Sequence, residues 1–289
     1  MKWSRRFAGS CRRSGLVSDK RWWDEFWTRE ASAGPALEGD GETWHDLVWK
    51  VGLEFWHDLF EKQAPGRKML ECGCGSARVS QHMARRGYRC TLLDYSERAL
   101  ATGRKAFDAS SLEGEFVIGD INHLCFPDGG FDIVFSGGVL EFFDDILRPI
   151  GEMARVLKPG GVFAANMVPR KVSIQTIADL ERTMAYSCRA LFQRRFGDVF
   201  RRVRYVPAYY PVNSLDLQDY VDCCKRAGLD PVVGLVTSPF PELALPHLGK
   251  KLYARVMKGL LPQWRKFNLS QSRWTQIWGI TYTVYGIKR

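Results

Sequence analysis

Short apolar runs alternate with amphipathic stretches of helical length through the middle of the chain. The runs are rich in Val, Ile, Leu and Phe and predict strands at 68–72, 89–93, 115–118, 131–136 and 161–167. The stretches between them repeat apolar residues every three or four positions and predict helices at 76–86, 96–107 and about 144–157. Such alternation is typical of a parallel sheet with helices on both faces, so the predicted fold class is α/β with a doubly wound sheet.

Further elements are predicted on both sides of this core. Before it, helices are expected at 19–30 and about 43–63. After it come expected helices at about 172–197, 216–227 and 249–261 and strands at 231–237 and 279–287. The two late strands bring the sheet to seven strands. Thr43 is the expected N-cap of the helix at 43–63, and Ser96 is the expected N-cap of the helix at 96–107. In the helix at 43–63 five side chains are expected to form the buried stripe: Trp44, Val48, Val51, Phe55 and Leu59.

Glycine and acidic residues gather where the predicted strands end. The first strand ends near Glu71 and is followed by a turn that contains Gly73 and Gly75, while the second ends at Asp94. Glycine lets the backbone approach a ligand closely, and the helix that follows offers free N–H groups. Asp94 lies 19 residues after Gly75, close to the spacing of a carboxylate that binds ribose hydroxyls. The pattern predicts an adenosine-type ligand at the carboxyl ends of the strands.

With two further strand ends, at Asp120 and at Gly137, the chain resembles the class I S-adenosylmethionine-dependent methyltransferases. The matching sequences are ECGCGSA at 71–77, LLDYS at 92–96, GDINHLCFPDGGFDIVFSGGVLEFF at 119–143 and EMARVLKPGGVF at 152–163. The resemblance covers about residues 66–166 and is nearest to the small-molecule and quinone-biosynthesis-type members. It implies a Rossmann-like, mostly parallel sheet and S-adenosylmethionine as the cofactor.

The resemblance also implies a set of cofactor-binding residues: Glu71, Gly73, Cys74, Gly75, Asp94, Tyr95, Asp120, Ile121, Ser136 and Gly137. In this set Glu71 and the glycine turn hold the methionine portion, and Asp94 takes the ribose hydroxyls. Tyr95 packs against adenine, Asp120 meets the adenine amino group, and Ile121 adds a backbone contact. Ser136 and Gly137 form the floor under the methionine tail. Ala77 stands where the family often has glycine.

Residues for catalysis and for the methyl acceptor are less defined. Many relatives place a histidine after the Leu-Glu pair that follows the fourth strand, but Phe142 follows Glu141 here. Glu141 is a candidate base, and no catalytic residue is assigned. Trp23 and Trp27, on an aromatic N-terminal helix expected to act as a lid, are candidates for substrate contact, with core packing as the alternative. Tyr209 and Tyr210 in the expected cap are further candidates.

The expected organisation has two parts. Residues 1–63 form a basic arm and an aromatic helical lid, and residues 64–289 form the methyltransferase domain. Within that domain 66–166 is the cofactor-binding core and about 168–213 is a cap insertion. Residues 214–289 hold the sixth and seventh strands and a basic helix.

The net charge of +10 lies mostly outside the core. Residues 66–166 hold 12 Lys and Arg against 13 Asp and Glu, and no acid follows Glu242. The excess favours an anionic partner, with a solvated basic face as the alternative. In the helix at 249–261, apolar Leu252, Val256, Met257 and Leu260 are expected to oppose Lys250, Lys251, Arg255 and Lys258. This pattern fits a core-facing surface helix or an interfacial membrane helix.

The cysteines and the lengths of the apolar runs argue against a disulfide-rich, a zinc-binding or a membrane-spanning protein. In a chain this long, the eight cysteines are not expected to form a disulfide framework. Cys72 and Cys74 lack the partner ligands of a zinc site, so no metal is expected. No apolar run is long enough to span a membrane. A cytoplasmic protein, or one peripheral at a membrane, is expected, and the oligomeric state stays open.

The leading hypothesis is methyl transfer to a small-molecule or lipid-like acceptor, with an anionic acceptor favoured by the basic arms. A nucleic-acid methyltransferase is the alternative enzyme, but the chain lacks an Asp/Asn-Pro-Pro-aromatic tetrapeptide after the fourth strand and a Pro-Cys dipeptide. Nucleic acid is therefore a disfavoured partner. An NAD-dependent oxidoreductase would need a third glycine in the turn and a Tyr/Lys relay pair. A protein that binds S-adenosylmethionine without catalysis is the remaining alternative.

Overall fold

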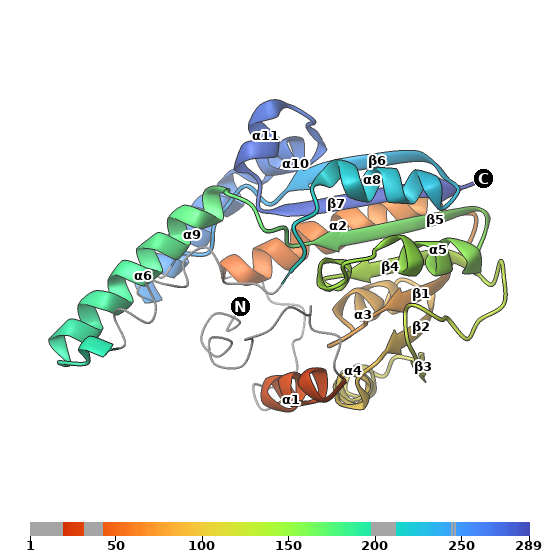
Figure 1. The fold of residues 1–289 in the computed structure, drawn as a ribbon, viewed down its shortest axis with the longest axis horizontal. Coiled ribbons are helices and arrows are strands. Elements are labelled where there is room, and N and C mark those ends of the chain that lie inside the picture. The colour runs from red at the N-terminus through yellow and green to blue at the C-terminus, as the bar shows by residue number, and fades with distance from the viewer. Residues whose placement is uncertain (1–19, 32–42, 198–211, 244, 246) are drawn as a thin grey trace.

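The computed structural model describes residues 20–31, 43–197 and 212–289 apart from 244 and 246. Its centre is a seven-stranded sheet (Figure 1). In spatial order the strands are β3 (Glu115–Ile118), β2 (Arg89–Asp94), β1 (Lys68–Cys72), β4 (Phe131–Gly137), β5 (Leu157–Met167), β7 (Thr281–Lys288) and β6 (Leu229–Thr237). The first five strands run parallel, and β7 runs antiparallel to both of its neighbours. The predicted mostly parallel, doubly wound sheet is confirmed.

Alternating side chains of the strands build one core on each face of the sheet. On β1, Met69 joins the core under α2 (Trp44–Gln63), α3 (Arg78–Ala84) and α4 (Glu97–Asp108). The next residue, Leu70, joins the core under α5 (Leu147–Val156) and α8 (Leu217–Arg226). Strands apolar on both sides need such double cover, which explains their near-continuous Val, Ile, Leu and Phe content.

The helices begin where capping residues predict. The Thr43 hydroxyl accepts a hydrogen bond from the Asp46 amide at 3.2 Å, and the Asp46 carboxylate accepts one from the Thr43 amide at 3.3 Å. The Ser96 hydroxyl accepts from the Ala99 amide at 3.2 Å at the start of α4. These bonds satisfy amides that have no partner in the first turn of a helix. Both predicted N-caps are confirmed.

Some element boundaries differ from the sequence prediction. Helix α3 begins at Arg78 instead of residue 76, because Ala77 is left-handed with φ 59° and extends the glycine turn. Strand β5 begins at Leu157 instead of residue 161, and α5 begins at Leu147 instead of residue 144. Two helices were not predicted: α10 (Leu261–Leu269) and α11 (Arg273–Trp278). They are short, and their apolar residues do not repeat over enough turns to mark a helix.

Helix α2 packs in two directions, which the predicted single stripe missed. Val51 and Leu59 are buried as expected, but Trp44, Val48 and Phe55 lie on a cavity wall and are only partly buried. The second half packs on the sheet through Leu53, Trp56, Leu59 and Phe60. The first half packs Leu47 and Val51 against α9 (His247–Gly259) and α10. The sequence assigned all of α2 to the lid, whereas its second half belongs to the core of the sheet.

Two helices stand apart from the sheet. Helix α1 (Lys20–Ala31) lies against α4, and α6 (Ile174–Phe192) extends away from the strands on the same side as α9 (Figure 1). Of the apolar residues along α6, Ile174 is buried, while Ile177, Leu180 and Met184 are exposed. The described part of the cap therefore projects into solvent.

Replacing Trp56 by alanine should lower the free energy of unfolding by about 3–5 kcal/mol, because a large buried side chain is lost and a cavity remains. Trp56 is 6% exposed, and its ring centroid lies 5.1 Å from that of Phe135. Urea unfolding followed by circular dichroism measures the change. Trp274→Ala is the control, since Trp274 is 74% exposed and a change within about 0.5 kcal/mol is expected. Equal losses in the two variants would contradict the packing of α2 on the sheet.

Candidate functional site

The candidate site lies where the order of the parallel strands reverses, between β1 and β4. From β1 the chain proceeds outward to β2 and β3, and from β4 it proceeds in the opposite direction to β5. The Ser136 hydroxyl at the end of β4 donates to the carbonyl oxygen of Cys72 at the end of β1, at 3.1 Å. Sheets of this kind bind ligands in the crevice outside the strand ends at such a point.

The turn after β1 is held tightly to the end of β2. The amides of Gly73 and Cys74 both donate to the carbonyl oxygen of Leu93, at 2.7 and 3.0 Å. Gly73 and Gly75 have φ angles of 72° and 52°, a region that favours glycine. A Cβ on Gly73 would lie 2.4 Å from a methyl group of Val139. Glycine at 73 therefore makes room for Val139, and both glycines line the cavity.

Ala77, the departure from the family's glycine, fits the turn because of a glycine opposite it. Its φ of 59° is left-handed, which costs a residue with a Cβ roughly 1–2 kcal/mol. Its methyl group lies 3.1 Å from the position that a Cβ of Gly103 on α4 would occupy. Gly103 thus makes room for Ala77, and the turn keeps its shape.

Three strand-end acids converge on this turn. Asp94 accepts from the Gly75 and Ser96 amides, each at 2.9 Å, and burial raises the pKa of its carboxyl to about 6. Glu71 accepts from the amide and hydroxyl of Ser80, and burial raises its pKa to about 7. Asp120 accepts from the Asn122 amide at 2.9 Å. All three acids line one cavity.

That cavity has a volume of 1160 Å³ and contains most of the residues proposed from sequence. The cofactor residues on its wall are Glu71, Gly73, Cys74, Gly75, Asp94, Tyr95, Asp120, Ile121 and Gly137. Ser136 is buried behind the wall, where its hydroxyl bonds to Cys72. Trp23 and Trp27 line the cavity from α1. Tyr209 and Tyr210 lie outside the described residues.

Glu141, the candidate base, does not contribute to the described wall of the cavity. It is buried in the short 3-10 helix Leu140–Phe142, and its Oε1 accepts from the Val168 amide at 3.1 Å. Its Oε2 has no hydrogen-bond partner among the described residues, and burial raises the pKa of the carboxyl to about 7. Glu141 therefore holds the chain that leaves β5 in place, and the geometry gives it no contact with a substrate.

Helix α1 closes one side of the cavity with aromatic rings. A Cβ on Gly75 would lie 2.5 Å from the Trp27 ring, so this ring packs directly on the glycine turn. The Trp23 ring meets that of Phe142 edge to face, with centroids 5.0 Å apart. The helix is attached to α4 by polar contacts, since Asp24 accepts from the Ser96 hydroxyl at 2.5 Å and Lys20 pairs with Glu97 at 2.8 Å.

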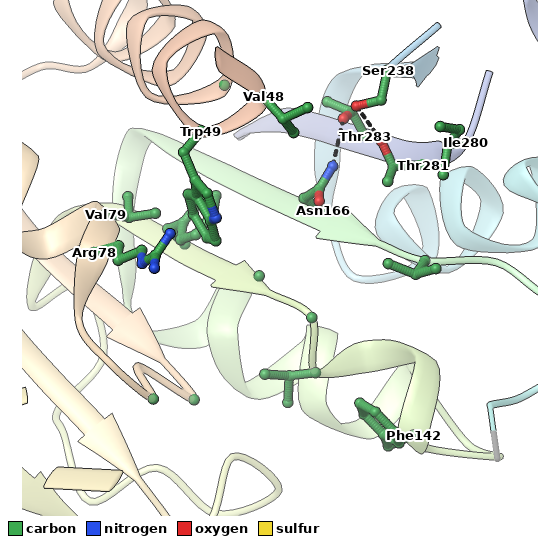
Figure 2. A pocket seen from close by; sticks show the side chains of 18 of the residues that line it. Val48, Trp49, Arg78, Val79, Phe142, Asn166, Ser238, Ile280, Thr281 and Thr283 are labelled. Carbon is green, nitrogen blue, oxygen red and sulfur yellow. Dashed lines mark hydrogen bonds between the residues drawn. The ribbon is translucent and has the colours of Figure 1, made fainter. Parts of the chain in front are cut away.

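Arg78, which sequence reasoning missed, brings a cation to the turn. Its guanidinium carbon lies 4.8 Å from the centroid of the Trp49 ring (Figure 2), and burial lowers the pKa of the group. The Trp49 indole donates to Nε2 of His45 at 3.2 Å, and burial lowers the pKa of His45 to about 4. His45 is therefore neutral at pH 7. Arg78 lies three residues after Gly75, and this position next to the turn could have identified it as a site residue from the sequence.

The far half of the cavity is polar and was also missed. Side chains from β5, β6 and β7 meet there: Asn166, Thr237, Ser238, Thr281 and Thr283. The Asn166 amide donates to the Thr283 hydroxyl at 3.0 Å, as Figure 2 shows. These residues lie far apart in the sequence and share no motif, so their meeting depends on the position of β7 between β5 and β6.

Lys171 follows β5 and lines the cavity, but its ammonium lies on the other side of the sheet from Thr283, beside Tyr282 of the core under α5 and α8. Its ammonium donates to the Gln276 carbonyl oxygen and lies 5.5 Å from the centroid of the Tyr282 ring. Burial lowers its pKa to about 8. Within the described residues Lys171 has no ion pair with a carboxylate. A partly desolvated ammonium in this setting is suited to bind an anionic ligand group.

The residues around the turn fit an adenosyl amino acid. Glu71 suits an ammonium group, Arg78 a carboxylate, and Asp94 a ribose diol, because each brings the complementary charge or acceptors. Gly73 and Gly75 line the same cavity as these side chains. S-adenosylmethionine carries all three groups, so the residues present fit it.

Comparison with known proteins agrees with this fit. Residues 70–165 match the protein family described as methyltransferase domain. The chain is 35% identical over 115 residues to malonyl-acyl-carrier-protein O-methyltransferase of Serratia marcescens, covering 40% of this chain and 43% of that protein. It is 35% identical over 116 residues to demethylmenaquinone methyltransferase of Corynebacterium glutamicum, covering 40% and 46%. The matches span less than half the length of these curated relatives.

Solved structures share the fold over nearly the whole chain. The 4+2 cyclase SpnF aligns with a TM-score of 0.55 at 16% identity, covering 96% of this chain and 99% of that one. A chain solved in complex with the Trm112 methyltransferase activator of Haloferax volcanii aligns with a TM-score of 0.51 at 17% identity, covering 93% and 97%. At these identities the likeness establishes the fold, which is Rossmann-like as predicted.

Binding of S-adenosylhomocysteine should weaken roughly tenfold between pH 7.5 and pH 6, and more steeply below pH 6. The ligand's ammonium and ribose favour ionised Glu71 and Asp94, whose pKa values in the free protein are about 7 and about 6. Protons therefore compete with the ligand as the pH falls. Calorimetric titrations across this range measure the effect, and Glu71→Gln should remove the step near pH 7.

Glu141→Gln is the matched control for this pH profile. Glu141 has the same raised pKa of about 7 but lies behind the cavity wall. Its substitution should leave the profile as in the wild type. A profile that changes in Glu141→Gln and persists in Glu71→Gln would contradict the assignment of Glu71 to the ligand's ammonium.

Trp27→Ala should weaken S-adenosylhomocysteine binding by roughly tenfold, mainly through faster dissociation, because the ring that covers Gly75 is lost. Stopped-flow displacement gives the dissociation rate. Trp274→Ala serves as the control, since Trp274 is exposed on α11. Equal dissociation rates in the wild type and in Trp27→Ala would show that α1 does not cover the ligand.

Proposed function

Because residues 70–165 match a methyltransferase domain and the site fits S-adenosylmethionine, we propose that the protein methylates a small or lipid-like acceptor at an anionic oxygen. One observation carries the proposal. A single cavity joins the acids at the ends of β1 and β2 to Lys171 and to the polar side chains of β5, β6 and β7. The first part suits the cofactor, and the second offers a separate place for the acceptor.

The size of the cavity supports two ligands bound side by side. Its volume is 1160 Å³, whereas a pocket for one small molecule has roughly 300–1,000 Å³. Trp23 and Trp27 line the cavity from α1, and Trp49 and Phe55 line it from α2. These rings exclude water from the space between the two halves, which favours a displacement reaction at a charged centre.

The acids of the described lining are already engaged, and this favours an acceptor that is already ionised. Glu71, Asp94 and Asp120 belong to the proposed cofactor half, and Asp179 and Glu242 have partners of their own. When bound, S-adenosylmethionine supplies a methyl group on a positively charged sulfur. Glu141 lies behind the wall, and Nε2 of neutral His45 is occupied by the Trp49 indole. A carboxylate oxygen has no proton to lose, so it forms the new bond to carbon as the carbon–sulfur bond breaks. The bonding electron pair remains on sulfur, and no proton moves.

Lys171 gives this acceptor a counter-charge. Lys171 lines the cavity and has no carboxylate partner among the described residues. In the free protein its ammonium donates to the Gln276 carbonyl oxygen, and in the proposed complex it turns toward the acceptor. The hydroxyl and amide groups of Thr281, Thr283 and Asn166 add hydrogen-bonding capacity in the cavity. Together they suit a polar, negatively charged head group, whose position relative to the methyl group is then fixed by the enzyme.

The named relatives supply probes for the acceptor. One is named for a malonyl carrier, which presents a carboxylate, and the other for demethylmenaquinone, which does not. The proposal selects the carboxylate. Malonyl N-acetylcysteamine thioester and dodecanoate represent carboxylates of different size, and dodecanamide and a reduced naphthoquinone represent neutral and phenolic acceptors.

Purified protein with methyl-labelled S-adenosylmethionine should transfer label to at least one of the two carboxylates and to neither control. Lys171→Met should lower that rate at least tenfold and leave S-adenosylhomocysteine affinity unchanged. Lys62→Met is the control, since Lys62 is an exposed lysine at the end of α2. Transfer to the naphthoquinol alone would contradict the carboxylate proposal. Binding of the cofactor without transfer to any probe would favour the non-catalytic alternative.

A further inference from the structure

Helix α9 exposes a row of apolar side chains that the core does not use. Leu252 and Val256 are 59% and 50% exposed, and Leu260, directly after the helix at the start of α10, is 37% exposed. The helix packs inward through Ala254 and Met257, which contact Leu47, Val51 and Trp264. The expected single apolar face at 249–261 is therefore wrong, because Met257 faces the core while its expected companions face solvent.

A row of positive charges borders the exposed row. Lys251, Arg255 and Lys258 are all exposed and lie on successive turns of α9. At 100° per residue they lie next to Leu252 and Val256 around the helix. No ion pair involves them within the part of the chain that the structure describes. The sequence from residue 243 to residue 289 contains no acid that would neutralise them.

The segment that precedes α9 lines the cavity. The segment that leads into α9 is bonded to the start of α6, where the Gln175 side chain accepts from the Glu242 amide at 3.0 Å. Both residues line the cavity. Helix α6 also exposes apolar residues, Ile177, Leu180 and Met184, and extends away from the sheet on the same side as α9 (Figure 1). An acceptor that entered from this side would pass the exposed faces of both helices.

We propose that α9 binds the surface of an anionic phospholipid membrane, with Leu252, Val256 and Leu260 inserted between head groups and Lys251, Arg255 and Lys258 on the phosphates. A helix with adjacent apolar and basic rows binds an interface in this way. The helix lies in the interface plane, and none of the described helices is long and apolar enough to cross a bilayer.

Charge and shape favour a lipid surface over other occupants. A second copy of the chain would bring the same positive row against this one, and like charges repel. A nucleic acid would pair with the charges but leave the apolar row without a partner. An anionic bilayer satisfies both rows at once, and it places the segment that precedes α9, which lines the cavity, near the lipid.

Co-sedimentation with phosphatidylglycerol-containing phosphatidylcholine vesicles tests the proposal on the full chain. The protein should bind these vesicles at least tenfold more strongly than vesicles of phosphatidylcholine alone, and added salt should weaken but not abolish binding. The double variant Leu252→Ser, Val256→Ser should lose at least tenfold in partitioning. Lys251→Glu with Arg255→Glu should lose as much.

The control reverses two charges elsewhere, Lys62→Glu and Lys105→Glu, on exposed positions of α2 and α4. This variant should bind vesicles like the wild type. All variants should keep wild-type affinity for S-adenosylhomocysteine and wild-type transfer to soluble acceptors, so failure here is distinct from failure of the proposed activity.

Three results would overturn the proposal. The first is equal binding to neutral and anionic vesicles, or to neither. The second is undiminished binding in both α9 variants. The third is a wild-type dimer in size-exclusion chromatography that becomes a monomer in the serine variant, which would make α9 an interface between copies.

Discussion

The site depends on one constraint: two backbone hydrogen bonds hold the turn after β1 to a single carbonyl oxygen near the end of β2. The amides of Gly73 and Cys74 share the Leu93 oxygen, and glycine at 73 and 75 allows the left-handed backbone that this requires. The turn then places the Gly75 amide against the Asp94 carboxylate at 2.9 Å. The start of α3, the position of Asp94 and the seat of the Trp27 ring all follow from this geometry.

Burial makes ionisation of the site's acids unfavourable in the free protein, and a bound cationic group offsets this cost in the complex. Burial raises the pKa of Glu71 from 4.5 to about 7, which corresponds to about 3 kcal/mol against the ionised form. Since the folded pKa exceeds the unfolded one, ionisation of Glu71 destabilises the fold as the pH rises from about 4.5 to about 7. A ligand ammonium beside Glu71 would offset this penalty. The same reasoning applies to Lys171, whose pKa is lowered by burial and whose charged form an anionic ligand would stabilise.

Sequence reasoning predicted the parts of the structure that local pattern determines. Strand periodicity located the sheet, and the caps Thr43 and Ser96 located two helix starts. The strand-end acids were found because a parallel sheet brings its carboxyl ends to one edge. The pattern of apolar residues did not show whether each of them packs in the core, lines the cavity or faces solvent. Val48 of α2 lines the cavity instead of the core, and Leu252 of α9 faces solvent. The polar half required the pairing of β7 with β5 and β6, which no motif encodes.

The central claim is that the glycine turn and Asp94 bind the adenosyl group of S-adenosylmethionine. Isothermal titration calorimetry of the wild type and of Asp94→Ala with S-adenosylmethionine, S-adenosylhomocysteine and NAD tests it most directly. The account predicts micromolar binding of the first two ligands by the wild type, no binding of NAD, and loss of binding in the variant. Undiminished affinity in Asp94→Ala, or binding of NAD in place of the sulfur ligands, would contradict it.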